Sequence, residues 1–192
     1  MKKSLFYLIK DLVLSEIGRT LSSVSCNEVE EFMDALVKAD KVFLIGAGRV
    51  MLMSQAFAKR INHLGIKVYI VGETTTPAGT RKSILVACSS SGETASVVTI
   101  AKVAKKHNLK IVVVTARKES TLAKLSDLCV VIPTPTKLRF TAGESSVAES
   151  KQPLGNLFEQ SLLIFFDSIA ILMRKKLGIS EKEMWRFHTN LE

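Results

Sequence analysis

The sequence is poor in cysteine and aromatic residues, and these shortages exclude several classes of protein. Its 192 residues include three cysteines, and aromatic residues make up 6% of the chain. Cys26, Cys88 and Cys129 have neither the even number of a disulfide framework nor the spacing of metal ligands. These features are typical of a protein from a reducing compartment, which we expect to be the cytoplasm.

The chain also lacks a hydrophobic run of membrane-spanning length. Its most apolar stretch, Leu162 to Met173, is short and is interrupted by Asp167. The first residues, Met1 to Leu5, are basic but are not followed by the apolar core and small-residue cleavage site of a secretory leader. We therefore expect a cytoplasmic location and no membrane partner.

Acidic residues are outnumbered by basic ones, with a net charge of +9, and this balance favours anionic partners. The lysines and arginines are scattered and few aromatic residues lie among them, which argues against a nucleic acid and favours phosphorylated metabolites. With 47% hydrophobic residues and four prolines, the chain is expected to fold as a single domain. We expect helices in residues 1–40 and an α/β core with C-terminal helices in residues 41–192.

Short apolar runs alternate with helical patterns along the chain, an order that predicts a parallel α/β sheet. Helices are expected at residues 4–18, at residues 27–39 after an Asn27 cap, at about 50–64 and at about 156–177. The expected strands are Val42–Ile45, Lys67–Val71, Ile84–Ala87, Lys110–Val114 and Leu128–Ile132.

A hydroxyl-rich segment, Ser89 to Thr94, follows the third expected strand and precedes a helical pattern. The first backbone N–H groups of a helix are unpaired and favour an anion, and serine and threonine hydroxyls are further donors. This pattern predicts a phosphate-binding loop that contains Gly92, although an ordinary helix cap is the alternative interpretation.

A second polar turn, Gly46-Ala47-Gly48-Arg49, follows the first expected strand. Met51 stands where a dinucleotide-binding motif has its third glycine, so the glycines indicate only a tight turn. Arg49 is a cation at a helix N-terminus, which is unfavourable unless it meets an anion. Because ligands bind at the carboxyl ends of parallel strands, we expect the two turns to share one site.

Glu159 is the candidate general base of this site. Leu162, Leu163 and Phe166 follow it at helical spacing, so it projects from an apolar face, where it could remove a proton next to a carbonyl. The alternative is a first-turn glutamate that interacts with the helix dipole. His63 and His188 are alternative candidates for an acid that opens a cyclic sugar.

Two segments near the C-terminus are expected to frame the long helix. Residues 133–153 are rich in proline, threonine, serine and glycine and predict a long surface loop. Gly178 should end the long helix, and a short helix should follow with Ser180 and Glu183 in a capping box.

Together these segments resemble the sugar isomerase (SIS) domain family. Ser89-Ser90-Ser91-Gly92-Glu93-Thr94 is similar to that family's S-x-S-G-x-T phosphate loop. Within the family, the 6-phospho-3-hexuloisomerases are the most similar, because the chain also contains Gly46–Arg49, Val71–Pro77, Gln152–Gln160 and the ending His188–Glu192.

The resemblance implies a three-layer α/β sandwich, flavodoxin-like or Rossmann-like, with a five-stranded parallel sheet. It also implies isomerisation of D-arabino-3-hexulose 6-phosphate to fructose 6-phosphate through a cis-enediol, as in formaldehyde fixation by the ribulose monophosphate route. A homotetramer with composite sites is implied, without a cofactor and without a metal. The implied catalytic residues are Glu159 and His188, and the implied substrate-binding residues are Gly48, Arg49, Val50, Ser89, Ser90, Ser91, Gly92, Glu93 and Thr94.

The sequence departs from the family pattern at two positions. Val50 stands where a serine hydroxyl usually helps to bind the sugar phosphate, so only its backbone N–H can take that part. Ser90 stands where glycine is commoner, and it would be strained if the position required a positive φ. Two alternatives remain: an isomerase of pentose or heptose phosphates, and a non-catalytic sugar-phosphate sensor.

Overall fold

A parallel five-stranded sheet forms the centre of the computed structural model, which describes residues 4–136 and 149–191. The strand order is β2-β1-β3-β4-β5, and every neighbouring pair is parallel. The predicted sheet is confirmed, and the ends of each expected strand lie within one residue of the observed ends. The strands are β1 (Val42–Ile45), β2 (Val68–Ile70), β3 (Ile84–Cys88), β4 (Lys110–Thr115) and β5 (Leu128–Val131).

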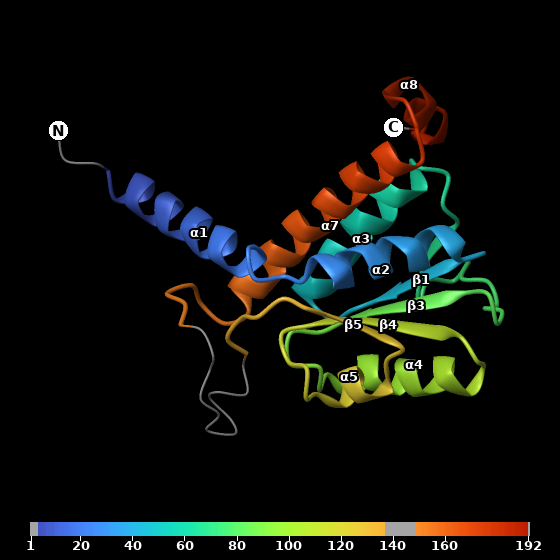
Figure 1. Ribbon diagram of the computed structural model, residues 1–192, viewed down its shortest axis with the longest axis horizontal. Helices are drawn as coiled ribbons and strands as arrows, with labels where there is room; N and C mark the ends of the chain where they lie inside the picture. Colours follow the sequence, from blue (N-terminus) through green and yellow to red (C-terminus); the bar gives the residue numbers. More distant parts are fainter. Residues whose placement is uncertain (1–3, 137–148, 192) are drawn as a thin grey trace.

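Helices cover both faces of the sheet and give the three layers that the family resemblance implied (Figure 1). One face carries α2 (Cys26–Lys38), α3 (Arg49–Asn62) and α7 (Asn156–Lys176), and the other carries α4 (Ala95–Lys106) and α5 (Thr121–Leu125). The two cores follow from the alternation of side chains along each strand. In β1, Leu44 joins the first core and Phe43 joins the second.

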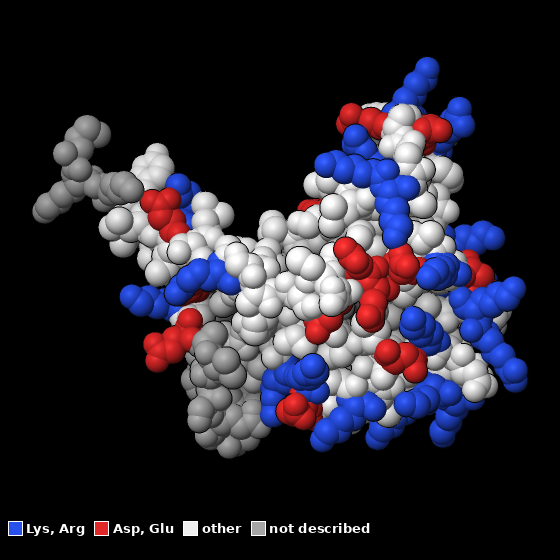
Figure 2. Space-filling view, viewed as in Figure 1, with Lys and Arg blue, Asp and Glu red and all other residues white. Residues whose placement is uncertain are grey.

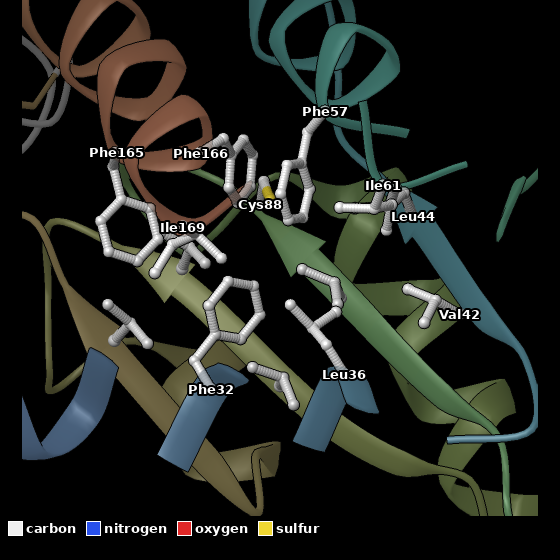
Figure 3. Packing of buried hydrophobic residues seen from close by; sticks show 14 of the residues in the cluster. Phe32, Leu36, Val42, Leu44, Phe57, Ile61, Cys88, Phe165, Phe166 and Ile169 are labelled. Carbon is white, nitrogen blue, oxygen red and sulfur yellow. The ribbon is translucent and has the colours of Figure 1, made fainter. Parts of the chain in front are cut away.

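Phenylalanines fill much of the larger core between α2, α3 and α7, and the rings of four of them pack against one another (Figure 3). The rings of Phe57 and Phe166 stack with centroids 4.1 Å apart, and Phe32 contacts both of them and Phe165. These contacts fix α7 against α3, because buried aromatic side chains contribute strongly to packing. The first turns of both helices are thereby held at the same edge of the sheet.

Helix α1 (Leu5–Leu21) projects away from the body of the molecule, and only its C-terminal part reaches α7 (Figure 1). The helix expected at residues 4–18 is present, but its apolar residues near the N-terminus are not covered within one chain. Leu5 and Phe6 are 72% and 69% exposed, and much of the projecting arm has uncharged surface between its charged side chains (Figure 2). Exposed apolar surface of this kind marks an interaction site.

The structure corrects the predicted helices in two details, a cap residue and an additional short helix. Ser25, rather than Asn27, caps α2, because its hydroxyl accepts from the Glu28 N–H. The short helix α5, capped by Ser120, has no counterpart among the helices predicted above, because five residues carry too little periodicity.

The C-terminal prediction is confirmed. Gly178 adopts φ +65° after α7, and Ser180 and Glu183 form both bonds of the capping box at the start of α8 (Glu181–Met184). A 3₁₀ turn, η1 (Trp185–Phe187), follows α8. Most of the loop expected at residues 133–153 lies outside the described residues.

Helix α7 is longer than the apolar run noted in the sequence. It has 21 residues and a mean hydropathy of 1.4 over its most apolar window, enough by length and composition to cross a membrane. Half of that window is buried inside the fold, where α7 packs against α1, α2 and α3. A helix that is apolar on most sides and buried among others is typical of a protein core.

Candidate active site

The two polar turns meet at the point where the order of the sheet reverses. β1 continues to β2 on one side and β3 to β4 on the other, so the carboxyl ends of these adjacent strands form a topological switch point. A cleft of ≈ 260 Å³ opens there. Its lining is Ala47, Gly48, Arg49, Val50, Cys88, Ser89, Ser90, Ser91, Thr94, Gly155 and Glu159.

Ser89 organises the hydroxyl-rich loop from within. Its Oγ lies 2.9 Å from Thr94 Oγ1 and accepts a hydrogen bond from the Gly92 N–H at 3.1 Å. Thr94 occupies the N-cap position of α4 without a side-chain capping bond. An ordinary helix cap therefore does not explain the threonine, and the first N–H groups of α4 stay available to an anion.

The two serines beside Ser89 complete the polar wall of the cleft. Ser91 Oγ accepts from the Glu93 N–H at 3.2 Å. Ser90 Oγ is buried and has no hydrogen-bond partner among the described residues. Ser90 does not have a positive φ, so the strain considered for this position is absent. An unpaired buried hydroxyl on a cleft wall is a candidate donor to a ligand.

Gly92 and Glu93 belong to the loop but do not line the cleft. The Glu93 carboxylate accepts from the Thr121 N–H at 2.8 Å and so stabilises the start of α5. Gly92 has φ +66°, and a Cβ there would overlap Ser120 Oγ and Cβ. The glycine is required by the turn and by the close approach of α5, rather than by a ligand.

Replacement of Gly92 by alanine should therefore destabilise the fold by about 2–4 kcal/mol, because it adds both backbone strain and a steric overlap. Urea unfolding of the variant measures this loss of free energy. Gly18→Ala is the matched control, since a Cβ at Gly18 meets nothing within 4 Å. In the control, stability should stay the same or rise by about 0.5–1 kcal/mol. Equal stability of the two variants would contradict the prediction.

The predicted base lies opposite the hydroxyl-rich loop and is paired with Arg49. Arg49 Nε is 2.6 Å from Glu159 Oε2, and the Arg49 NH2 group donates to Asn156 Oδ1 at 3.1 Å. The Glu159 side chain is 13% exposed and that of Arg49 is 59% exposed. Glu159 lies in the first turn of α7, so the dipole interpretation also applies. The carboxylate is the anion that Arg49 needs at the start of α3.

Val50 and Cys88 are the apolar members of the lining. Val50 is buried, and its Cγ1 faces the backbone of Gly46, so no side-chain donor replaces the family's serine. Burial raises the pKa of the Cys88 thiol to about 12, so this thiol stays protonated near neutral pH and is not a nucleophile. Chemistry at this cleft therefore depends on the hydroxyls, on Arg49 and on Glu159.

The two histidines lie far from this cleft within one chain. His63 follows the last residue of α3, whereas Arg49 is its first, and the helix rise separates them by roughly 20 Å. His63 and His188 stack with centroids 5.3 Å apart, and Trp185 packs on His188 at 4.6 Å. They line a second cavity of ≈ 530 Å³ together with Arg60. One chain thus does not bring His188 to its own Glu159.

Among residues 4–136 and 149–191, no cluster of histidine, cysteine, aspartate and glutamate has the geometry of a metal site. The cleft instead combines anion donors, from Ser89 to Thr94 at the start of α4, with one ion-paired carboxylate. Such a site can hold a phosphate group while a carboxylate moves a proton nearby.

Comparisons with known proteins show which family and which relatives the chain is similar to. The SIS domain model matches residues 35–149. The 3-hexulose-6-phosphate isomerase of Bacillus subtilis is 32% identical over 94% of this chain and 95% of its own, and that of Mycobacterium gastri is 35% identical over 94% and 88%. A Methanococcus jannaschii crystal structure, from which a 3-hexulose-6-phosphate isomerase function was inferred, has a TM-score of 0.80 at 32% identity and covers 95% of this chain and 98% of that one.

Proposed function

The chain belongs to the SIS domain family, and on this premise we propose that it converts D-arabino-3-hexulose 6-phosphate to fructose 6-phosphate. It is a sugar-phosphate isomerase, since relatives named for that activity match it over nearly its whole length. One observation carries the proposal: a paired carboxylate and a hydroxyl-rich anion loop line the same cleft. We include in the proposal a cytoplasmic location and catalysis without a cofactor.

The substrate phosphate is placed at the start of α4 in this proposal. Ser89, Ser91 and Thr94 contribute hydroxyls, Ser90 contributes its unpaired Oγ, and the helix N–H groups contribute backbone donors. Gly48 and Val50 face the same cleft and offer backbone contacts to the sugar. Gly92 and Glu93 act indirectly, because they fix the loop against α5.

Glu159 is assigned the proton transfer. In the proposed reaction it removes the proton from C2, and the electron pair forms the C2=C3 bond of a cis-enediol as O3 takes up a proton. The O2 proton then leaves to solvent, which balances the proton that O3 took from solvent, the carbonyl forms at C2, and Glu159 returns a proton to C3. Arg49 holds the carboxylate in place and offers positive charge to the enediol oxygens.

His188 is the proposed acid for ring opening, and it would come from a neighbouring subunit. Within its own chain it lies beside His63, at the far end of α3 and α7 from the cleft. The exposed apolar arm of α1 provides surface for self-association. The family resemblance implies a homotetramer with composite sites, and we include this assembly in the proposal.

A serine at position 50 should improve substrate binding, because it restores a hydroxyl at the start of α3. One hydrogen bond to a charged group contributes about 1.5 kcal/mol or more, so Val50→Ser should lower KM by about tenfold. Steady-state kinetics measures this change. Val50→Ala removes the same methyl groups without adding a hydroxyl and should not lower KM. An equal fall of KM in both variants would refute the role of the hydroxyl.

The proposed function is tested by a coupled assay on purified protein. The assay supplies 3-hexulose 6-phosphate and follows fructose 6-phosphate, and pentose and heptose phosphates are tested in parallel. The proposal is supported if the protein turns over 3-hexulose 6-phosphate with a higher kcat/KM than any of the pentose or heptose phosphates. A higher kcat/KM for a pentose or heptose phosphate would show that this compound, and not the hexulose phosphate, is the substrate. Binding of sugar phosphates without turnover of any of them would indicate a sensor.

A further inference from the structure

A buried carboxylate on α1 begins a chain of hydrogen bonds that ends at the candidate base. Glu16 is 4% exposed, although most of α1 projects into solvent. Its carboxylate accepts from Ser150 Oγ at 2.7 Å, from the Lys151 N–H at 3.0 Å and from Gln152 Nε2 at 3.0 Å. Three donors thus meet one buried carboxylate, which is how proteins accommodate such a group.

The chain continues from Gln152 through Asn156 to the cleft. Gln152 Oε1 accepts from Asn156 Nδ2 at 2.9 Å, and Asn156 Oδ1 accepts from Arg49 at 3.1 Å. The same guanidinium meets Glu159 through its Nε at 2.6 Å. These five side chains, from Glu16 to Glu159, form what we call the amide relay. It connects α1, the segment before α7, and the first turns of α3 and α7.

The charged groups on either side of the two amides, Glu16 and Arg49, fix the direction of the hydrogen bonds between them. An ionised carboxylate can only accept hydrogen bonds, and a guanidinium can only donate them. Glu16 therefore orients the Gln152 amide with its NH₂ group toward α1, and Gln152 in turn orients Asn156. As a result Asn156 presents an oxygen, and not an NH₂ group, to Arg49.

The relay needs an ionised carboxylate at Glu16, and the surroundings of Glu16 favour this charge state. Burial by itself raises the pKa of Glu16, but the hydrogen bonds from Lys151, Ser150 and Gln152 and the positive charge of Arg19 together outweigh it. The pKa of this carboxyl consequently lies below its ordinary value, and it is ionised near neutral pH.

We propose that Glu16, Gln152 and Asn156 are positioning residues, which orient Arg49 against Glu159 and so couple the N-terminal helix to proton transfer. This proposal rests on the proposed function, because it concerns the base of that reaction. If the relay is broken, Arg49 gains rotational freedom and Glu159 loses its fixed direction. A small misplacement of a catalytic group is enough to lower a rate strongly.

A double-mutant cycle tests the relay, because the hydrogen bonds that connect Glu16 with Asn156 run through Gln152. Glu16→Gln and Asn156→Ala should each lower kcat about tenfold and change KM less than threefold. The double variant should lose about tenfold and not a hundredfold, since either change alone already breaks the relay. Multiplicative losses would overturn the proposal. Should Glu16→Gln fail to fold, Gln152→Leu takes its place in the cycle.

Asp11→Asn is the matched control, since Asp11 is an exposed carboxylate on the same helix and outside the relay. Its kcat should equal that of the wild type. An equal loss in Asp11→Asn would indicate a general effect of α1 and overturn the relay.

A second measurement does not require turnover and separates the two proposals. The Nε–H resonance of Arg49, assigned by its absence in Arg49→Lys, should shift in Glu16→Gln and stay unchanged in Asp11→Asn. An unshifted resonance in Glu16→Gln would overturn the relay, whether or not the wild type is active. If the resonance shifts in Glu16→Gln but the wild type has no isomerase activity, the relay is kept and the proposed function is rejected.

Discussion

Replacement of Glu159 by glutamine is expected to lower kcat by about 10³-fold while sugar-phosphate affinity is retained. Glutamine has nearly the same shape but cannot accept a proton from carbon, and general base catalysis contributes about 10²–10⁴ to a rate. The phosphate loop around Ser89 is hydrogen-bonded independently of Glu159, so binding should change less than threefold. Steady-state kinetics and calorimetric titration with fructose 6-phosphate measure the two quantities.

The matched control for this variant is Glu30→Gln, an exposed glutamate on α2 that does not line the cleft. It should leave both kcat and KM unchanged. If Glu159→Gln retains more than a tenth of the wild-type rate, the proton is moved by another group. If it loses rate and affinity together, Glu159 acts in binding, and the ion pair with Arg49 has a structural role.

The outline of this site could be predicted from the sequence because its local signals are strong. Polar turns follow β1 and β3, and parallel strands bring their carboxyl ends to the same edge. Helical spacing also indicated that Glu159 faces the core side of α7. These inferences depend on residues that are close together in the chain, where periodicity and turn chemistry are informative.

The partners of those residues could not be predicted in the same way. The ion pair of Arg49 with Glu159 joins residues more than a hundred positions apart, and no local pattern relates them. Ser120 is the reason that position 92 must be glycine, yet it caps a helix that is too short for a periodic signal. Buried polar groups reveal their role only once the fold provides their donors, as it does for Glu16.

The N-terminal helix shows a different limit of the sequence pattern. Its apolar residues recur at helical spacing, which indicates a face that is covered, but one chain leaves Leu5, Leu8 and Ile9 exposed. A hydrophobic pattern indicates that a helix face is buried, but it does not say whether the same chain or a partner chain covers that face. The positions of His63 and His188, away from their own cleft, raise the same question about a neighbouring subunit.

Two inactive variants should therefore restore activity when they assemble together. His188→Ala is expected to lower kcat by about 10²-fold through loss of the ring-opening acid. When Glu159→Gln and His188→Ala chains are unfolded, mixed equally and refolded, a site has each wild-type group with a probability of one half. If the two groups come from different subunits of a symmetric oligomer, about a quarter of the sites are intact and the mixture regains about a quarter of the wild-type rate.

A composite site predicts that recovery requires assembly, so each variant refolded alone should stay inactive. If His188 acts on its own chain's Glu159, every chain in the mixture carries one defect, and the rate cannot exceed the mean of the two parents. That result would reject the composite site. It would also require α7 and η1 to rearrange, because the roughly 20 Å between the ends of α3 separates His188 from the cleft within one chain. The experiment thus decides between a second chain and a conformational change as the means of bringing the histidine to the base.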